Sequence, residues 1–260
     1  MLPVLAQFGP FTLYTYSVLL NLGLAAALGW LYWAAPADRR ARWLDVGLAA
    51  VVGGLIGARA VYVAVNAAYY AAHPLEAFML WQGGLAWVGA AGGALLGAGW
   101  WARRRGEPLG PILDALAGPL AALSALGWGG CLAAGCGYGA EVAAGQLPAW
   151  LVSTAPDLYG LSVPRWPTQL AGLLWGGISL WLVWSSRTRR WPAGALGLYA
   201  LSLTALGAFA LGFVRGEPTP LAAGFRLDVV GAALVLVAAT LGWASRVRPS
   251  APRADANTAR

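Results

Sequence analysis

Long runs of apolar residues, separated by short polar connections, dominate the pattern along this chain. A transmembrane helix needs about 20 mostly apolar residues to cross roughly 30 Å of hydrocarbon. Seven runs meet this condition, and we expect each to form a membrane-spanning helix: 13–35, 43–65, 80–102, 109–134, 168–186, 193–214 and 228–245. The pattern therefore predicts an all-α, polytopic membrane protein with seven transmembrane helices.

Composition supports this prediction and excludes two other classes of protein. Of the 260 residues, 59% are hydrophobic and 10% are charged. A soluble globular domain has about 25% charged residues, so the chain is not expected to be one. Intrinsic disorder requires low hydrophobicity, so the hydrophobic content of 59% excludes it.

The basic residues are all arginine and are unevenly distributed. Against 10 acidic residues, the 17 arginines give a formal net charge of +7. Thirteen of them fall on a single side of the membrane if the seven spans alternate: Arg39, Arg40, Arg42, Arg103, Arg104, Arg105, Arg187, Arg189, Arg190, Arg246, Arg248, Arg253 and Arg260. The positive-inside bias places this side in the cytoplasm, with the N-terminus outside and the C-terminus inside. The positive charge is thus a topology signal, and we expect no nucleic-acid partner.

Two segments lie outside the apolar runs. Residues 137–167, between the fourth and fifth spans, are too long for a simple turn and contain many apolar side chains, so they predict a small cap on the outer side. Residues 246–260 are polar and rich in Pro and Ala, which predicts a disordered, basic, cytoplasmic tail. Residues 1–245 form a single membrane domain in this interpretation.

Four arginines remain on or near the outer half: Arg59, Arg165, Arg215 and Arg226. Arg59 falls within the second span, where an ionisable group costs at least about 2.5 kcal/mol and normally faces a partner or a cavity. It either forms a structural pair or binds an anionic headgroup, because the guanidinium fork fits phosphate. Together with Arg165 and Arg215, it could build a basic pocket for a phospholipid headgroup near the outer leaflet.

Asp114 and the two cysteines are the other chemically distinctive residues. Asp114 lies in the fourth span and is either a helix cap or buried hydrogen-bond acceptor, or a catalytic group. Cys131 and Cys136 are five residues apart, and positions i and i+5 do not share a helix face, so we expect small buried thiols. Two thiols and a distant His73 do not make a tetrahedral metal site, and no metal is predicted.

Several short motifs occur in a fixed order along the chain. They are F-G-P-F-T-L-Y-T-Y at 8–16, G-A-R-A-V-Y-V at 57–63, W-Q-G-G-L-A-W-V-G at 81–89, G-W-G-G-C-L-A-A-G-C-G-Y-G at 127–139, P-R-W-P-T-Q-L at 164–170 and F-V-R-G-E-P at 213–218. In this order, and with Asp114 between the third and fourth, the set resembles the prolipoprotein diacylglyceryl transferase family. The resemblance covers residues 9 to 218.

The resemblance implies a function, a location and a set of site residues. Members of this family transfer a diacylglyceryl group from phosphatidylglycerol to the lipobox cysteine of prolipoproteins in the bacterial plasma membrane, without a cofactor. The expected partners are therefore phosphatidylglycerol, prolipoprotein signal peptides with a lipobox, and membrane lipids. The motif positions assign catalytic roles to Tyr16, Arg59 and Arg215. They assign substrate-binding roles to Tyr62, Asn66, Gly135, Gly139, Arg165, Gln169 and Glu217.

Polar positions of the family carry other side chains here. They are Val88, Trp128, Cys131 and Trp166. Two functions from the same family therefore remain to be compared: transfer, and binding of phospholipid or lipoprotein precursor without transfer. A transporter is a third hypothesis, but the sequence lacks the internal symmetry that such folds usually carry.

Overall fold

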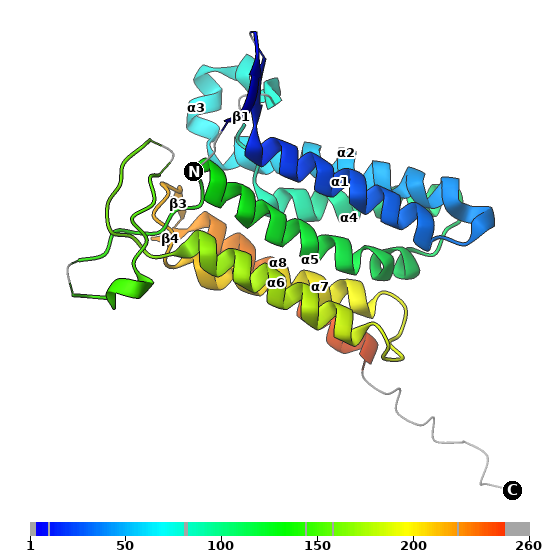
Figure 1. Ribbon diagram of the computed structural model, residues 1–260. Coiled ribbons are helices and arrows are strands. Elements are labelled where there is room, and N and C mark those ends of the chain that lie inside the picture. Colours follow the sequence, from blue (N-terminus) through cyan, green and yellow to red (C-terminus); the bar gives the residue numbers. More distant parts are fainter. Residues whose placement is uncertain are drawn as a thin grey trace, which may run out of the picture.

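The computed structural model describes residues 4–9, 11–80, 83–143, 145–157, 159–222 and 224–247. Long helices dominate it (Figure 1). The helices are α1 (Thr15–Ala34), α2 (Arg40–Val65), α3 (Ala67–Ala72), α4 (Trp87–Arg105), α5 (Leu109–Ala134), α6 (Thr168–Ser186), α7 (Ala195–Gly212) and α8 (Leu227–Val247). Three 3-10 turns, η1 (Ala37–Arg39), η2 (Pro74–Phe78) and η4 (Ala149–Leu151), and two short hairpins, β1–β2 (Val4–Phe8, Phe11–Tyr14) and β3–β4 (Leu221–Ala222, Phe225–Arg226), complete the described elements.

The long helices lie roughly alongside one another, and the two ends of the bundle differ (Figure 1). At one end are the α1–α2, α4–α5 and α6–α7 connections. The first three arginine runs lie in these connections or in the adjoining helix turns. At the other end are the β1–β2 hairpin, α3, the segment between α5 and α6, and the β3–β4 hairpin. The part of the predicted tail after Val247 lies outside the described residues.

The surface of the bundle is that of a membrane protein. Five helices, α1, α2, α5, α7 and α8, are long and apolar enough to cross a bilayer. In four of them only 17% of the most apolar 18-residue stretch is buried within the protein. Large apolar side chains such as Leu96 and Leu234 are 77% and 67% exposed, and a soluble monomer rarely exposes apolar surface of this extent. Lipid is the solvent that such surfaces require, and the protein is an all-α membrane protein.

Helices α2 and α4 pack with their backbones in close contact. Glycines recur every fourth residue on both helices, at Gly53 and Gly57 of α2 and at Gly89, Gly93 and Gly97 of α4. A methyl group on Gly93 would overlap the carbonyl oxygen of Gly53, and a methyl group on Gly57 would overlap that of Gly89. Small residues allow this approach in lipid, where apolar side chains alone give helices little reason to associate. The pair fixes the position of Arg59, two residues beyond Gly57.

We expect Gly93→Ala to destabilise the bundle, because the new methyl group forces two backbones apart. The cost of such overpacking is about 1–3 kcal/mol, which lowers Tm by roughly 3–10 °C in a chain of this size. Gly92→Ala is the matched control, since no atom lies within 4 Å of its added methyl group. Thermal unfolding of the two variants in one detergent checks this prediction, and equal Tm values would contradict it.

Two features of the fold differ from the expected spans. The predicted span 80–102 begins as a helix only at Trp87, because Gly83 and Gly84 adopt positive φ angles of 83° and 76° and turn the chain before the helix starts. Residues 4–8 and 11–14 form the β1–β2 hairpin, which the apolar pattern did not indicate.

Candidate functional site

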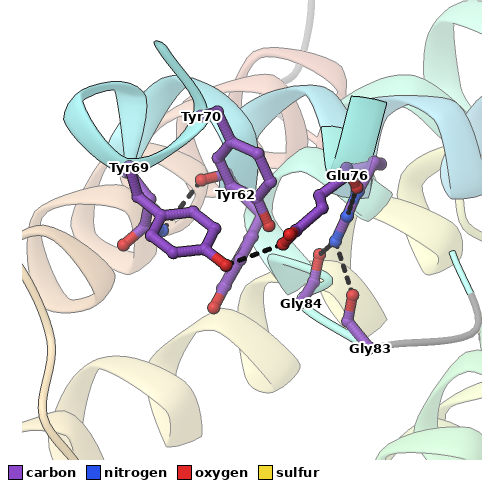
Figure 2. Close-up of a pocket in the computed structure, with 8 residues that line it drawn as sticks. Tyr62, Tyr69, Tyr70, Glu76, Gly83 and Gly84 are labelled. Atoms are coloured by element: carbon purple, nitrogen blue, oxygen red, sulfur yellow. Dashed lines mark hydrogen bonds between the residues drawn. The ribbon is translucent and has the colours of Figure 1, made fainter. Parts of the chain in front are cut away.

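A pocket of about 350 Å³ lies where α2 ends. We call it the α2-end pocket; it is lined by Arg59, Tyr62, Asn66, Tyr69, Tyr70, Glu76, Gly83 and Gly84. Figure 2 shows the tyrosines of α2 and α3 facing Glu76 and the two glycines. Three of these residues, Arg59, Tyr62 and Asn66, are among the predicted site residues.

Arg59 is buried and binds the loop that forms one wall of this pocket. Its Nε donates to the carbonyl oxygen of Ala77 at 2.9 Å, and its Nη1 donates to those of Gly83 and Gly84. Its Nη2 donates to the carbonyl oxygens of Glu76 and Met79. A guanidinium has five N–H donors, and all five are used. Arg59 is therefore an organiser of the loop, while its positive charge faces no carboxylate within ion-pair distance among the described residues.

The aromatic wall of the pocket surrounds this charge. The Arg59 guanidinium lies 5.9 Å from the ring centre of Tyr62 and 5.3 Å from that of Tyr70, which are cation–π distances. The Tyr69 hydroxyl donates to Glu76 at 2.7 Å, and this hydrogen bond raises the pKa of Tyr69 above its ordinary value (Figure 2). Asn66 ends α2 and donates to the carbonyl oxygen of Tyr62.

A second group of residues gathers where α5 ends, at the same end of the bundle. We call Tyr16, Trp128, Gly137, Arg215 and Glu217 the α5-end cluster. Glu217 accepts a hydrogen bond from the backbone N–H of Gly137 at 2.5 Å and forms an ion pair with Arg215. The Arg215 guanidinium also lies 5.8 Å from the ring centre of Trp128.

Tyr16 enters the α5-end cluster from the start of α1. Its ring packs against α5, since a methyl group on Gly130 would come within 2.8 Å of the ring. Tyr16 is also within electrostatic range of Arg215 and Glu217. Gly130 has only a hydrogen as its side chain, and this leaves room for the Tyr16 ring near Arg215 and Glu217.

Arg215 retains unused hydrogen-bond donors. Its Nη2 is paired with Glu217, whereas its Nε is buried with no partner in the part of the chain that the structure describes. By contrast, Arg226 uses all three nitrogens: its Nε donates to Asp228, its Nη1 to the carbonyl oxygen of Arg215, and its Nη2 to Thr219 and Asp228. The Nη1 of Arg215 makes no hydrogen bond among the described residues and its side chain is 26% exposed, so Arg215 is a fixed, partly exposed cation that can donate to an anion.

The prediction of free, buried cysteines is wrong, because Cys131 and Cys136 form a disulfide. A disulfide was not expected, because a helix that continues through both residues would hold the two side chains on different faces. Instead, α5 stops at Ala134, and Gly135 caps it with a φ angle of +80°. This left-handed turn brings the two Cα atoms to 4.5 Å. The helix break was indicated by Gly135 itself, since glycine is the usual residue at this cap.

Arg165 forms a structural pair next to the cluster. It is buried, and it donates to Asp157 at 2.9 Å while lying 4.6 Å from the ring centre of Tyr138. Its Nη1 also donates to the carbonyl oxygen of Gly139, and Gly139 pairs through its backbone with Arg215. Gly139 is therefore the link between the two arginines.

Asp114 is a hydrogen-bond acceptor at the opposite end of the bundle. Its carboxylate accepts from the backbone N–H groups of Gly194, at 2.7 Å, and Gly197, at 3.1 Å. These groups belong to the start of α7, whose first N–H groups have no partner within the helix. Of the two alternatives for Asp114, the structure shows the cap.

The predicted site residues thus fall into two networks. Gln169 donates to the carbonyl oxygen of Cys136 at 2.8 Å. Gln169 therefore lies next to the α5-end cluster, as do Gly135 and Gly139. Among the described residues, no hydrogen bond or ion pair joins the side chains of the two networks, and every hydrogen bond of the Arg59 side chain goes to a backbone carbonyl oxygen of residues 76–84. Trp81 and Gln82 of the third motif lie outside the described residues.

Tyr69, Tyr70 and Glu76 line the α2-end pocket but were not among the predicted site residues. Positions 62, 66, 69 and 70 have the i, i+4, i+7, i+8 spacing of one helix face. The chain interrupts that helix at Asn66, between α2 and α3, and no comparable spacing indicates Glu76.

Comparisons with known proteins agree with these motifs. The family model described as "Prolipoprotein diacylglyceryl transferase" matches residues 3–245. The chain is 33% identical to a phosphatidylglycerol–prolipoprotein diacylglyceryl transferase of Rhodococcus jostii, over 89% of this chain and 69% of the relative. It is 29% identical to a protein of the same name from Parasynechococcus marenigrum, over 96% of both chains.

Proposed function

The chain belongs to the prolipoprotein diacylglyceryl transferase family, and we propose that its reaction takes place at the α5-end cluster. The reaction moves a diacylglyceryl group from phosphatidylglycerol to a cysteine thiol of a prolipoprotein, the lipobox cysteine of its signal peptide. Neither a cofactor nor a metal is needed, because the lipid carries its own leaving group.

All seven long helices cross the bilayer in this proposal. Helices α4 and α6 have 19 residues each, which is about 28 Å of helix and close to the hydrocarbon thickness. Their ends lie at the same two ends of the bundle as those of the five more apolar helices (Figure 1). Their lower hydropathy has a local cause, because α4 ends in three arginines and both helices are rich in Gly and Trp.

The arginine-rich end faces the cytoplasm, and the α5-end cluster faces outward. The arginine runs support this orientation through the positive-inside bias. The Cys131–Cys136 disulfide supports it independently, since disulfides persist in oxidising compartments outside the cytoplasm. The N-terminal hairpin then lies outside and the end of α8 inside, in a multi-pass protein of the bacterial plasma membrane. The segment between α5 and α6 becomes the outer cap.

The chemistry is a displacement at a glyceryl carbon of the lipid. The thiolate sulfur of the prolipoprotein forms a C–S bond, the C–O bond to phosphate breaks, and glycerol phosphate leaves with the electron pair. The thiol proton passes to the departing glycerol phosphate or to water, so atoms and charge balance. A free thiol has a pKa of about 8.5, so a cationic site favours the reactive thiolate. The same positive charge stabilises the departing phosphate.

Arg215 is the group best arranged to supply this charge. The observation that carries the proposal is its guanidinium, which Glu217 and Trp128 hold in place, which is 26% exposed, and whose Nη1 makes no hydrogen bond in the described part of the chain. Tyr16 belongs to the same cluster and can donate a hydrogen bond to a phosphate or glycerol oxygen. Glu217 supports substrate binding by orienting Arg215 through their ion pair.

The remaining predicted residues support the surface that receives the substrates. Arg59 contributes a positive charge, and Tyr62 and Asn66 line the α2-end pocket at the same end of the bundle. Arg165 holds the cap through Asp157. Gly135, Gly139 and Gln169 shape the turn that carries Gly137, and we assign them no direct chemical step.

A transfer assay tests the function. We expect the purified protein, reconstituted with phosphatidylglycerol, to add one diacylglyceryl mass to a lipobox peptide, as measured by mass spectrometry. The matched control is the same peptide with serine in place of the lipobox cysteine, which should remain unmodified. Retained lipid binding without the adduct would contradict the transferase and favour a protein that only binds.

A further inference from the structure

The turn that follows α5 is built around two left-handed glycines and one disulfide. Gly135 and Gly137 have φ angles of +80° and +64°, and between them Cys136 is joined to Cys131 in the last turn of α5. A methyl group on Gly137 would lie 3.0 Å from the Trp128 ring and 3.6 Å from the Cys131 sulfur. The turn is therefore folded back tightly against the end of its own helix.

This turn presents backbone groups to two other parts of the chain. The N–H of Gly137 donates to Glu217, and its carbonyl oxygen accepts from the Thr168 hydroxyl at 2.7 Å. The carbonyl oxygen of Cys136 accepts from Gln169 at 2.8 Å. The disulfide-closed turn thus connects the start of α6 to the Arg215–Glu217 pair.

The Arg215–Glu217 pair needs a fixed partner to hold one geometry. Its side chains are 26% and 21% exposed, and an ion pair that solvent can reach contributes little on its own. A rigid backbone donor on the second carboxylate oxygen restricts Glu217, and Glu217 then restricts Arg215. Glycine-rich turns lose much conformational freedom when they order, and a covalent link reduces the freedom that must be lost.

We propose that the Cys131–Cys136 disulfide is a positioning element for catalysis, which acts on Arg215 through the Gly137 amide and Glu217. The inference rests on the proposed role of Arg215. It gives a function to two side chains that carry no chemistry in the reaction itself. Trp128 completes the arrangement, because it contacts both the turn and the guanidinium.

A double-mutant cycle tests the proposal. We expect Cys131→Ser/Cys136→Ser to lower kcat about tenfold in the otherwise unchanged protein, with the KM for phosphatidylglycerol within threefold. In a Glu217→Gln background, which already lacks the charged link, the same cysteine changes should lower kcat by less than twofold. Coupled residues give such non-additive effects, whereas independent ones give the same factor in both backgrounds. An equal factor in both backgrounds would overturn the proposal.

A second measurement separates this proposal from the assignment of Arg215. Hydrogen exchange of a peptide that contains Gly137 should be at least tenfold faster in the cysteine-free protein, while peptides from α2 and α4 keep their rates. Unchanged exchange at Gly137 would overturn the positioning role. Full activity of an Arg215→Ala variant would instead overturn the proposed site, whatever the disulfide does.

Discussion

Arg215→Ala is expected to lower the rate of diacylglyceryl transfer by about 10²–10³-fold, the effect of removing one pre-positioned donor from a site where negative charge develops. The loss should fall on kcat, because the phosphate carries most of its new charge in the transition state. Arg215→Lys should recover only part of the rate, since an ammonium lacks the guanidinium fork. Initial rates with the lipobox peptide provide the measurement.

The matched control for this prediction is Arg187→Ala. Arg187 is exposed at the arginine-rich end and lies over the ring of Trp184, far in the fold from the α5-end cluster. Its loss should leave the transfer rate within twofold. An Arg215→Ala protein that is as active as the Arg187→Ala protein would show that the reaction takes place elsewhere.

Arg59→Ala is expected to have the largest effect on stability. The change removes the guanidinium donor from the carbonyl oxygens of five residues between Glu76 and Gly84. Hydrogen bonds to charged groups contribute about 1.5–3 kcal/mol each, and a buried carbonyl oxygen left without a donor costs about 1–3 kcal/mol, so we expect a total loss of about 3–5 kcal/mol. We expect Tm to fall by roughly 6–15 °C at the scaling for this chain length, and residues 73–84 to become sensitive to protease.

Tyr69→Phe is the control for the loop. It removes one exposed hydrogen bond, to Glu76, from the same pocket and should change Tm by less than 3 °C. If Arg59→Ala unfolds at the same temperature as Tyr69→Phe, the loop does not depend on the guanidinium, and Arg59 is then free for the substrate.

The positions of the long helices could be predicted well from the apolar pattern. The predicted spans 43–65 and 168–186 correspond to Arg40–Val65 and Thr168–Ser186. The pattern works because a chain in lipid must satisfy its backbone within each helix. It failed at the start of α4, where glycines with positive φ angles break an apolar run without changing its hydropathy.

The site was harder to predict, because its contacts depend on loops. The motif positions identified Arg59 and Arg215, but not that Arg59 uses every donor on a loop while Arg215 keeps some unused. The disulfide was missed because residue spacing was judged on a continuous helix, and Gly135 ends that helix. The main partners in both networks are backbone carbonyl and amide groups. Because nearly every residue has the same backbone groups, residue identity does not show which of them will be used.

The most direct test of this account uses phosphatidylglycerol labelled in both its headgroup and its acyl chains. We expect the reconstituted protein to release one labelled glycerol phosphate for each acyl-labelled peptide formed, and Arg215→Ala to lower both products equally. Tight binding of the lipid, with neither label transferred or released, would contradict it.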